Sequence, residues 1–210
     1  MFFHFRAVFL VALLALSFSG CGQKAAPATP QVEKEETALL AGKKIAMLIA
    51  HKDFRDEEYQ TPRKLFEAQG ATVKVASSSL EEAGGMLGAK VKPDMLLKDV
   101  KVAEYDAIIF VGGSGATEYW DDPTAHAIAK EAVEKGKVLA AICIAPATLA
   151  KAGVLKGKKA TVFSSAAGEL KAAGCDYTGQ PVERDGKIIT ANGPDAAEKF
   201  AAEVIKALRE

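Results

Sequence analysis

Cys143 lies at the junction between a strand-like and a helix-like stretch of the sequence. Residues 139–142 are uninterruptedly apolar, whereas residues 144–150 are rich in alanine and typical of a helix. A cysteine held at such a turn projects from the top of a sheet, and the free amides and dipole of the following helix favour its thiolate form. This position suits a nucleophile, although an inert cysteine packed in an apolar core would have the same local sequence.

Two other apolar stretches end in residues that could complete a site with Cys143. In an open parallel sheet, sites form beyond the carboxyl ends of the strands. One stretch, residues 45–50, leads into His51 and a charged segment, so His51 could reach the site. The other, residues 107–111, leads into the glycine-rich segment Gly112-Gly113-Ser114-Gly115.

The glycine-rich segment permits three interpretations. Its amides could approach the cysteine and form an oxyanion hole with the amide of Cys143 or Ile144. The glycines could instead serve a tight turn that needs positive φ angles. A dinucleotide-binding loop is disfavoured, because the sixth position of that motif is Glu118 and the segment does not follow the first strand. We favour the oxyanion hole because the strand before Cys143 comes next in the chain.

Apolar runs that could form strands alternate with helical patterns from residue 45 to residue 208. The expected strands cover residues 45–50, 72–76, 107–111 and 138–142, and the expected helices cover residues 56–69, 123–135 and 194–208. Strands that are apolar on both faces and separated by helices form parallel sheets covered on both sides. The sequence therefore predicts an α/β fold with a doubly wound, mostly parallel sheet. Residues 84–100 and 181–190 are expected to form hairpins, the second around an Asp-Gly turn.

The charge of the chain and its few potential metal ligands limit its partners. It has 27 Lys and Arg against 27 Asp and Glu, without the basic cluster that nucleic acid binding requires. The cysteines are too few for a disulfide framework, and we do not expect Cys143 to pair with Cys175. Beyond the N-terminal segment only His51 and His126 remain, and His126 is expected on a helix surface. We therefore expect no metal site and no cofactor.

The N-terminal segment has the pattern of an export signal. Residues 1–6 carry a short basic n-region that ends in Arg6, residues 7–16 are apolar, and small residues precede Cys21. The apolar run is too short to cross about 30 Å of hydrocarbon. The cysteine after it resembles the lipobox of bacterial lipoproteins, in which the signal is removed before a cysteine that becomes lipid-modified. Phe18 stands where leucine is usual, and an ordinary cleavable signal that leaves Cys21 free is the alternative.

The chain is accordingly expected to have three parts: a signal peptide over residues 1–20, a lipid-attachment cysteine and tether over residues 21–41, and a folded domain over residues 42–210. The tether is rich in Ala, Pro, Thr, Gln, Lys and Glu and has little to bury, which predicts disorder. We expect an exported lipoprotein of the cell envelope, attached to the membrane by its lipid.

Four segments together resemble the ThiJ/PfpI superfamily, which includes the parkinsonism-associated deglycase-like protein and PfpI-type proteases. They are residues 54–58, residues 109–116, residues 140–143 with Pro146 and Leu149, and residues 185–191. The resemblance covers residues 43–210, with the motifs in the family's order. It implies the flavodoxin-like fold of the class I glutamine amidotransferases and a homodimer.

The resemblance also implies roles for individual residues. Cys143 matches the family's reactive cysteine at a nucleophile elbow. Glu58 matches its buried glutamate by lying four residues before Pro62, although a first-turn glutamate that only complements the helix dipole is the alternative. Gly112 and Gly113 match glycines that present amides to the sulfur.

The chain departs from the family pattern at three positions. Protease-like members have histidine directly after the cysteine, where this chain has Ile144, and a second histidine position is occupied by Phe163. Arg55 replaces a second glutamate. The usual Cys/His pair is thus missing, which argues against a PfpI-type peptidase, and His51 and Arg55 are left as accessory candidates.

Two functions follow from the resemblance. The first is a cysteine-dependent hydrolase, glyoxalase-like or deglycase-like, in which Cys143 attacks a small carbonyl compound. The second is a non-catalytic redox or stress-response module, in which an oxidant converts Cys143 to a sulfinic acid stabilised by Glu58.

Replacing Cys21 by alanine should release the protein from membranes, because the residue expected to carry the lipid is then absent. Cell fractionation of the native chain, the Cys21→Ala variant and a Cys175→Ser control measures this effect. The control keeps the expected lipid site and should fractionate like the native chain. A Cys21→Ala protein that stays bound to membranes, or a native chain that is soluble and unlipidated, would contradict the anchor.

Overall fold

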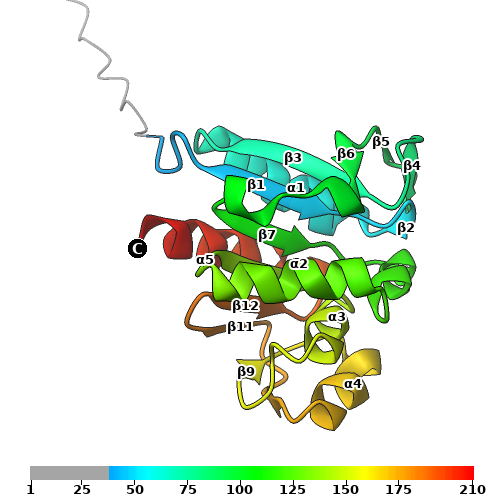
Figure 1. The fold of residues 1–210 in the computed structure, drawn as a ribbon, viewed down its shortest axis with the longest axis vertical. Helices are drawn as coiled ribbons and strands as arrows, with labels where there is room; N and C mark the ends of the chain where they lie inside the picture. The colour runs from blue at the N-terminus through cyan, green and yellow to red at the C-terminus, as the bar shows by residue number, and fades with distance from the viewer. Residues whose placement is uncertain (1–37) are drawn as a thin grey trace, which may run out of the picture. The chain divides into compact units, whose positions relative to one another are not determined.

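A seven-stranded sheet with the order β11-β12-β8-β7-β1-β3-β6 crosses the domain in the computed structural model, which describes residues 38–210 (Figure 1). Its strands are β1 (Lys44–Leu48), β3 (Thr72–Ser77), β6 (Met95–Leu96), β7 (Ala107–Phe110), β8 (Val138–Ile142), β11 (Val182–Asp185) and β12 (Ile188–Ala191). Neighbouring strands are parallel except β11, which pairs antiparallel with β12. The predicted doubly wound α/β fold is confirmed. The expected signal peptide, Cys21 and most of the expected tether lie outside the described residues.

The central strands are buried on both faces, as their apolar sequences predict. In β1, Ile45 and Met47 belong to the hydrophobic core on one side of the sheet, whereas Ala46 and Leu48 belong to the core on the other side. Successive side chains of a strand point to opposite faces, so a strand in the middle of a covered sheet must be apolar throughout.

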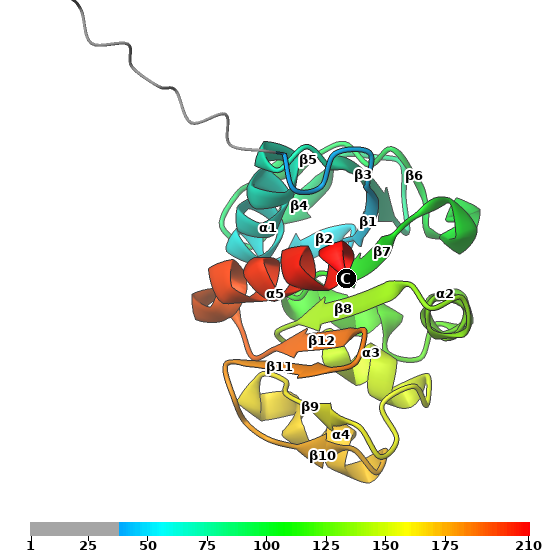
Figure 2. The ribbon, with the colours of Figure 1, turned by 90° about the vertical axis from the view of Figure 1, so that its left-hand side faces the viewer.

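Helices cover both faces of the sheet (Figure 2). The helices α1 (Asp56–Ala68) and α5 (Ala197–Arg209) pack together on one face, and α2 (Pro123–Glu134) and α3 (Pro146–Lys151) pack on the other. Gly70 follows α1 with a φ of 85°, a conformation that glycine adopts without steric strain and that ends the helix. Pro194 opens a 3-10 turn (Pro194–Ala196) that leads into α5, so the α-helix itself begins slightly later than the sequence predicts.

The hairpin predicted for residues 84–100 is only half right. A small sheet contains β2 (Lys52–Phe54), β4 (Ala83–Gly85) and β5 (Lys90–Val91), and β4 and β5 do form an antiparallel hairpin. The chain then leaves this hairpin, and β6 pairs with β3 in the central sheet. Asp94 explains the departure, because its carboxylate accepts hydrogen bonds from the amide of Val75 at 2.8 Å and from Lys74 at 2.9 Å.

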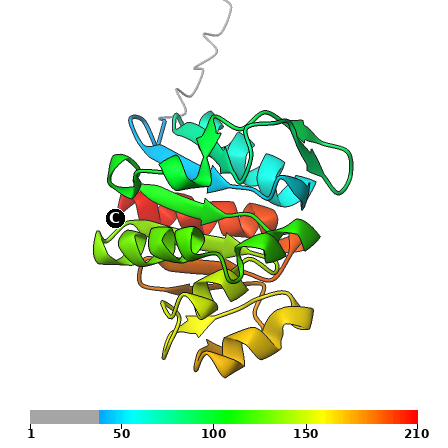
Figure 3. The ribbon, with the colours of Figure 1, turned by 45° about the vertical axis from the view of Figure 1, so that its right-hand side comes forward.

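The second predicted hairpin is confirmed by β11 and β12, with Gly186 at a φ of 63° in the turn. At one end of the domain lie β9 (Lys159–Ala160), α4 (Ala167–Ala172) and β10 (Asp176–Tyr177), none of which the sequence analysis predicted (Figure 3). Over residues 38–210, the structure contains no helix that is long and apolar enough to cross a membrane.

Replacing Ile109 by alanine should destabilise the domain by about 2–5 kcal/mol, because this fully buried side chain lies in the middle strand β7 and its loss leaves a cavity. The matched control is Val133→Ala on α2, where the side chain is 41% exposed and the change should be within about 0.5 kcal/mol. Urea unfolding of both variants measures the difference. Equal losses would show that the sheet interior is not the core described here.

Candidate active site

Cys143 directly follows β8 at the carboxyl edge of the sheet, with a φ of 63°. Among the described residues, Asp53 is the only other residue besides glycine with a positive φ. Such a conformation costs on the order of 1–3 kcal/mol and persists when its surroundings hold it. Here the Cys143 amide donates to the carbonyl of Ala191 at 2.9 Å, and its carbonyl accepts from the amide of Phe163 at 2.8 Å. Bonds from two separate segments therefore fix the cysteine at the turn.

Glu58, in the first turn of α1, is fully buried against the same point of the sheet. A Cβ atom placed on Gly112 would overlap both Cys143 Cβ and Glu58 Oε2, so the two side chains converge over this glycine. Within residues 38–210, neither carboxyl oxygen of Glu58 has a hydrogen-bonding partner of good geometry. The site thus contains a buried carboxyl group beside a sulfur atom.

Burial raises the pKa of Glu58 to about 7. The neighbouring Cys143 thiol, the charge of Arg55 and the amide of Gly112 oppose this rise, although the thiol and the amide lie short of good hydrogen-bond geometry. The carboxyl group is therefore protonated in a large share of molecules at neutral pH.

Burial, followed by the negative charge of Glu58, raises the pKa of Cys143 to about 12, while the amides of Gly113 and Ile144 lower it. This direction is opposite to the one expected from a helix N-terminus alone. Because Glu58 and Cys143 influence each other, they titrate as a pair that holds one proton above about pH 7. With the higher pKa on Cys143, this proton resides mainly on the sulfur at neutral pH, and a thiolate forms when it passes to the Glu58 carboxylate.

The glycine-rich segment packs directly against the loop that precedes α1. Gly113 has a φ of 102°, and a Cβ atom on it would lie 2.6 Å from the carbonyl carbon of Phe54. The amide of Arg55 donates to the carbonyl of Gly112 at 2.9 Å. Only glycine permits both the positive φ and this approach of two backbones. The amide of Gly113 lowers the pKa of the Cys143 thiol, whereas the amide of Gly112 lowers the pKa of Glu58.

The amide of Ile144, like that of Gly113, lowers the pKa of Cys143. Trp120 helps to fix the backbone of Ile144. The indole nitrogen of Trp120 donates to the carbonyl of Ile144 at 3.2 Å. The Trp120 carbonyl lies 2.7 Å from Nε2 of His126, which is half-buried rather than on the surface as expected. Sequence reasoning missed Trp120, because nothing in its local sequence shows a contact 24 residues away.

The two accessory candidates differ in their relation to Glu58 and Cys143. Arg55 interacts with both through its charge, whereas His51 is hydrogen-bonded to Glu118. The Arg55 guanidinium donates to Glu57 from Nε at 2.8 Å and from Nη2 at 3.0 Å, and its charge acts on Glu58 and Cys143. The amide of His51 donates to Oε1 of Glu118 at 3.2 Å, and its ring Nδ1 is buried without a hydrogen bond. His51 is not among the main groups that shift the pKa of either member of the pair.

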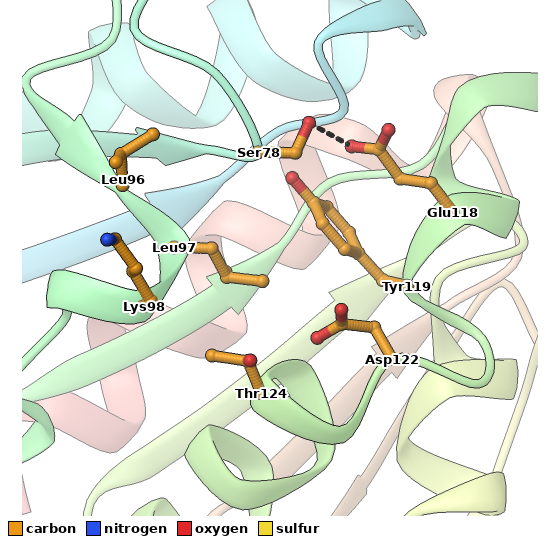
Figure 4. A pocket seen from close by; sticks show the side chains of 8 residues that line it. All are labelled: Ser78, Leu96, Leu97, Lys98, Glu118, Tyr119, Asp122 and Thr124. Carbon is orange, nitrogen blue, oxygen red and sulfur yellow. Dashed lines mark hydrogen bonds between the residues drawn. The ribbon is translucent and has the colours of Figure 1, made fainter.

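Two hollows lie near the carboxyl edge of the sheet. One of about 270 Å³ lies where Ser78 donates to Glu118 at 3.1 Å (Figure 4). Its lining residues, none of which contributes to the cysteine site, are Ser78, Leu96, Leu97, Lys98, Glu118, Tyr119, Asp122 and Thr124. The other, of about 320 Å³, is lined by Phe163, Tyr177 and Asn192 among others, and Phe163 is bonded to the Cys143 backbone. The described residues contain no group of three or more His, Cys, Asp or Glu side chains arranged to hold a metal ion.

The fold and the site define a class: α/β proteins with a doubly wound sheet, in which a cysteine with a positive φ lies at a strand-to-helix turn beside a buried glutamate. A model of the DJ-1/PfpI family matches residues 43–207, and the chain belongs to this family.

Known proteins resemble the chain over most of its length. MJ0967 of Methanocaldococcus jannaschii is 42% identical over 208 residues, which are 98% of each chain. "Deglycase TK1284" of Thermococcus kodakarensis is 31% identical over 78% of this chain and 98% of its own. "Glutathione-independent glyoxalase DJR-1.2" of Caenorhabditis elegans is 28% identical over 81% of this chain and 91% of its own. A crystal structure of a ThiJ/PfpI domain protein from Brachyspira murdochii superimposes with a TM-score of 0.78 at 32% identity, covering 80% of this chain and 98% of that one.

Folding stability should fall as the pH rises from about 4.5 to about 7, because folding raises the pKa of Glu58 from 4.5 to about 7. The folded state binds this proton more tightly, so the stabilisation is complete below the unfolded pKa and is lost as the pH passes the folded pKa. At about 1.4 kcal/mol per pKa unit, the loss is on the order of 3 kcal/mol.

Urea unfolding at about pH 5 and about pH 7.5 measures this loss. The Glu58→Gln variant has no titrating group at this position, so its stability should change less between the two pH values. Glu104→Gln removes an exposed glutamate and should keep the native difference. A native difference that survives in Glu58→Gln would assign the pH dependence to another group.

Proposed function

We propose that the protein is a cysteine-dependent enzyme that converts small carbonyl compounds by glyoxalase-like chemistry. The observation that carries the proposal is the convergence of Cys143 and the buried Glu58, with two backbone amides acting on the sulfur. The names of two relatives, a deglycase and a glyoxalase, support this chemistry. The net reaction adds one water molecule to an α-oxoaldehyde and yields a 2-hydroxy acid.

In the first step, the Cys143 thiolate attacks the aldehyde carbon of the substrate. A carbon–sulfur bond forms, and the electron pair of the carbonyl double bond moves to the oxygen. The amides of Gly113 and Ile144 are the donors available to stabilise this oxyanion. The proton held by Glu58 then passes to the oxygen, which gives a thiohemiacetal.

The resulting Glu58 carboxylate is the base closest to the adduct. It takes a proton from the carbon bonded to sulfur and returns it to the adjacent carbon, while the hydroxyl proton of the thiohemiacetal passes to the ketone oxygen, so that the adduct becomes a thioester of the 2-hydroxy acid. Water then cleaves the thioester and regenerates the thiol. A carboxyl group with a pKa of about 7 suits both directions of proton transfer at neutral pH.

A redox module is the second candidate function, and the lack of a histidine acting on Cys143 favours it. Two equivalents of a peroxide would oxidise the sulfur to a sulfinic acid, and each peroxide would be reduced to water or an alcohol. A protonated Glu58 would donate a hydrogen bond to the sulfinate. The oxidant is then the partner, in place of a carbonyl substrate.

The cellular setting belongs to the same proposal. We propose that the protein is exported, attached to the outer face of a membrane through Cys21 and assembled as a homodimer. The signal-like pattern of residues 1–20 supports the first two points, and the family resemblance supports the third.

Replacing Cys143 by serine should abolish conversion of methylglyoxal to lactate, whereas Cys175→Ser should retain it. Cys175 donates to the carbonyl of Lys158 at 3.2 Å and has no part in the site. Glu58→Gln keeps a hydrogen-bond donor but cannot transfer a proton, so its kcat should fall about 10²-fold or more. In Glu58→Leu, which also lacks the donor, the pKa of Cys143 should lie above its value in the Gln variant.

Lactate formation and the thiolate absorbance against pH measure these effects. Turnover that survives in Cys143→Ser would refute the enzyme proposal. Stoichiometric addition of two oxygen atoms to Cys143 by dilute peroxide, without any turnover of aldehydes, would establish the redox module instead. Identical Cys143 titrations in the native, Gln and Leu proteins would remove Glu58 from the site.

A further inference from the structure

Arg55 is fixed at the rim of the site by its backbone. It is the N-cap residue of α1, and its amide donates to the carbonyl of Gly112 at 2.9 Å. A Cβ atom on Gly113 would overlap the Arg55 amide nitrogen, so this backbone touches the glycine whose amide acts on the sulfur. The position of Arg55 relative to the Cys143 site therefore does not depend on a flexible loop.

Only one edge of the Arg55 guanidinium is used within the described part of the chain. Nε and Nη2 donate to the two oxygens of Glu57, at 2.8 and 3.0 Å. A guanidinium has five N–H groups, and a second pair, on Nη1 and Nη2, forms another edge that matches a carboxylate. No hydrogen bond from Nη1 is found in residues 38–210, and the side chain is 29% exposed, so this edge is open to solvent.

The charges around Arg55 leave room for a further anion. Glu57 is paired with it, and Glu58 carries a proton in a large share of molecules at neutral pH. Asp56 is buried and directed elsewhere, because its carboxylate accepts from the amides of Leu87 at 2.8 Å and Ala89 at 2.7 Å. A guanidinium with one carboxylate partner and an open donor edge favours a second carboxylate.

From this geometry we infer that Arg55 binds the carboxylate of an anionic substrate through its open edge while Cys143 attacks the carbonyl of the same molecule. The substrate class is thus small carbonyl compounds that carry a carboxylate group. The inference rests on the proposed function in one respect, the role of Cys143 as nucleophile. Arg55 is the specificity-determining residue of the site in this scheme.

The first test uses two alkylating reagents of nearly equal size, iodoacetate and iodoacetamide, of which only the first carries a carboxylate. In both reactions the thiolate forms a carbon–sulfur bond and iodide leaves, so their rate ratio cancels any change in the Cys143 pKa. The ratio of the iodoacetate to the iodoacetamide rate, measured by peptide mapping at Cys143, should fall about tenfold in Arg55→Gln. Arg55→Lys, which keeps the charge without the fork, should give an intermediate ratio.

Arg63→Gln is the matched control. Arg63 also lies at α1 and donates from Nε to a glutamate, Glu67, at 2.8 Å, but it is not among the main groups acting on the Cys143 thiol. In Arg63→Gln, the ratio of the iodoacetate to the iodoacetamide rate at Cys143 should equal the native ratio. The same ratio measured at Cys175 should be equal in all the proteins. A ratio unchanged in Arg55→Gln, or lowered as much in Arg63→Gln, would overturn the inference.

A second test uses reversible ligands with the same ketone. Pyruvate should slow the alkylation of Cys143 by iodoacetamide in the native protein, whereas the neutral pyruvamide should do so much less. In Arg55→Gln this difference should disappear, and equal protection by both ligands in the native protein would refute the carboxylate site. These tests need no turnover. If neither reagent labels Cys143, the proposed function fails, because Cys143 is then not a nucleophile. If both reagents label Cys143 and the carboxylate makes no difference, only the Arg55 inference fails.

Discussion

The close approach of two backbones, the glycine-rich segment and the loop before α1, determines the rest of the site. Gly112 and Gly113 have no side chains, so Phe54 and Arg55 can lie directly against them. This contact sets the first turn of α1 at the carboxyl edge of the sheet and places Glu58 beside Cys143. A methyl group at Gly112 would overlap Cys143 and Glu58, and one at Gly113 would overlap the backbone that leads into α1.

Burial of Glu58 gives the site its chemistry at the expense of stability. A carboxylate removed from water without hydrogen bonds is unfavourable, so the group retains its proton to a higher pH. In the proposed reaction, that proton serves in place of a histidine acting on the sulfur. The domain can tolerate this arrangement because the strands around it are almost completely apolar and well packed.

The sequence was sufficient for the fold and for part of the site. The alternation of apolar strands and amphipathic helices is a local pattern, so β1, β7, β8 and the helices between them could be predicted. The position of β6 depends on the carboxylate of Asp94, which bonds to a strand about 20 residues away, and no local pattern reveals such a contact. Glu58 looks like an ordinary first-turn glutamate in its own segment, and only the family spacing singled it out. The separate effects of the Gly112 and Gly113 amides, one on Glu58 and the other on Cys143, can be distinguished only in the folded structure.

The short strand β6 has a consequence for how copies of the domain can meet. It forms one edge of the central sheet but contains only two residues, Met95 and Leu96. A strand from another molecule needs a longer row of free backbone groups to add to a sheet, and short edge strands protect proteins from such addition. Addition of a foreign strand alongside β6 itself is therefore disfavoured.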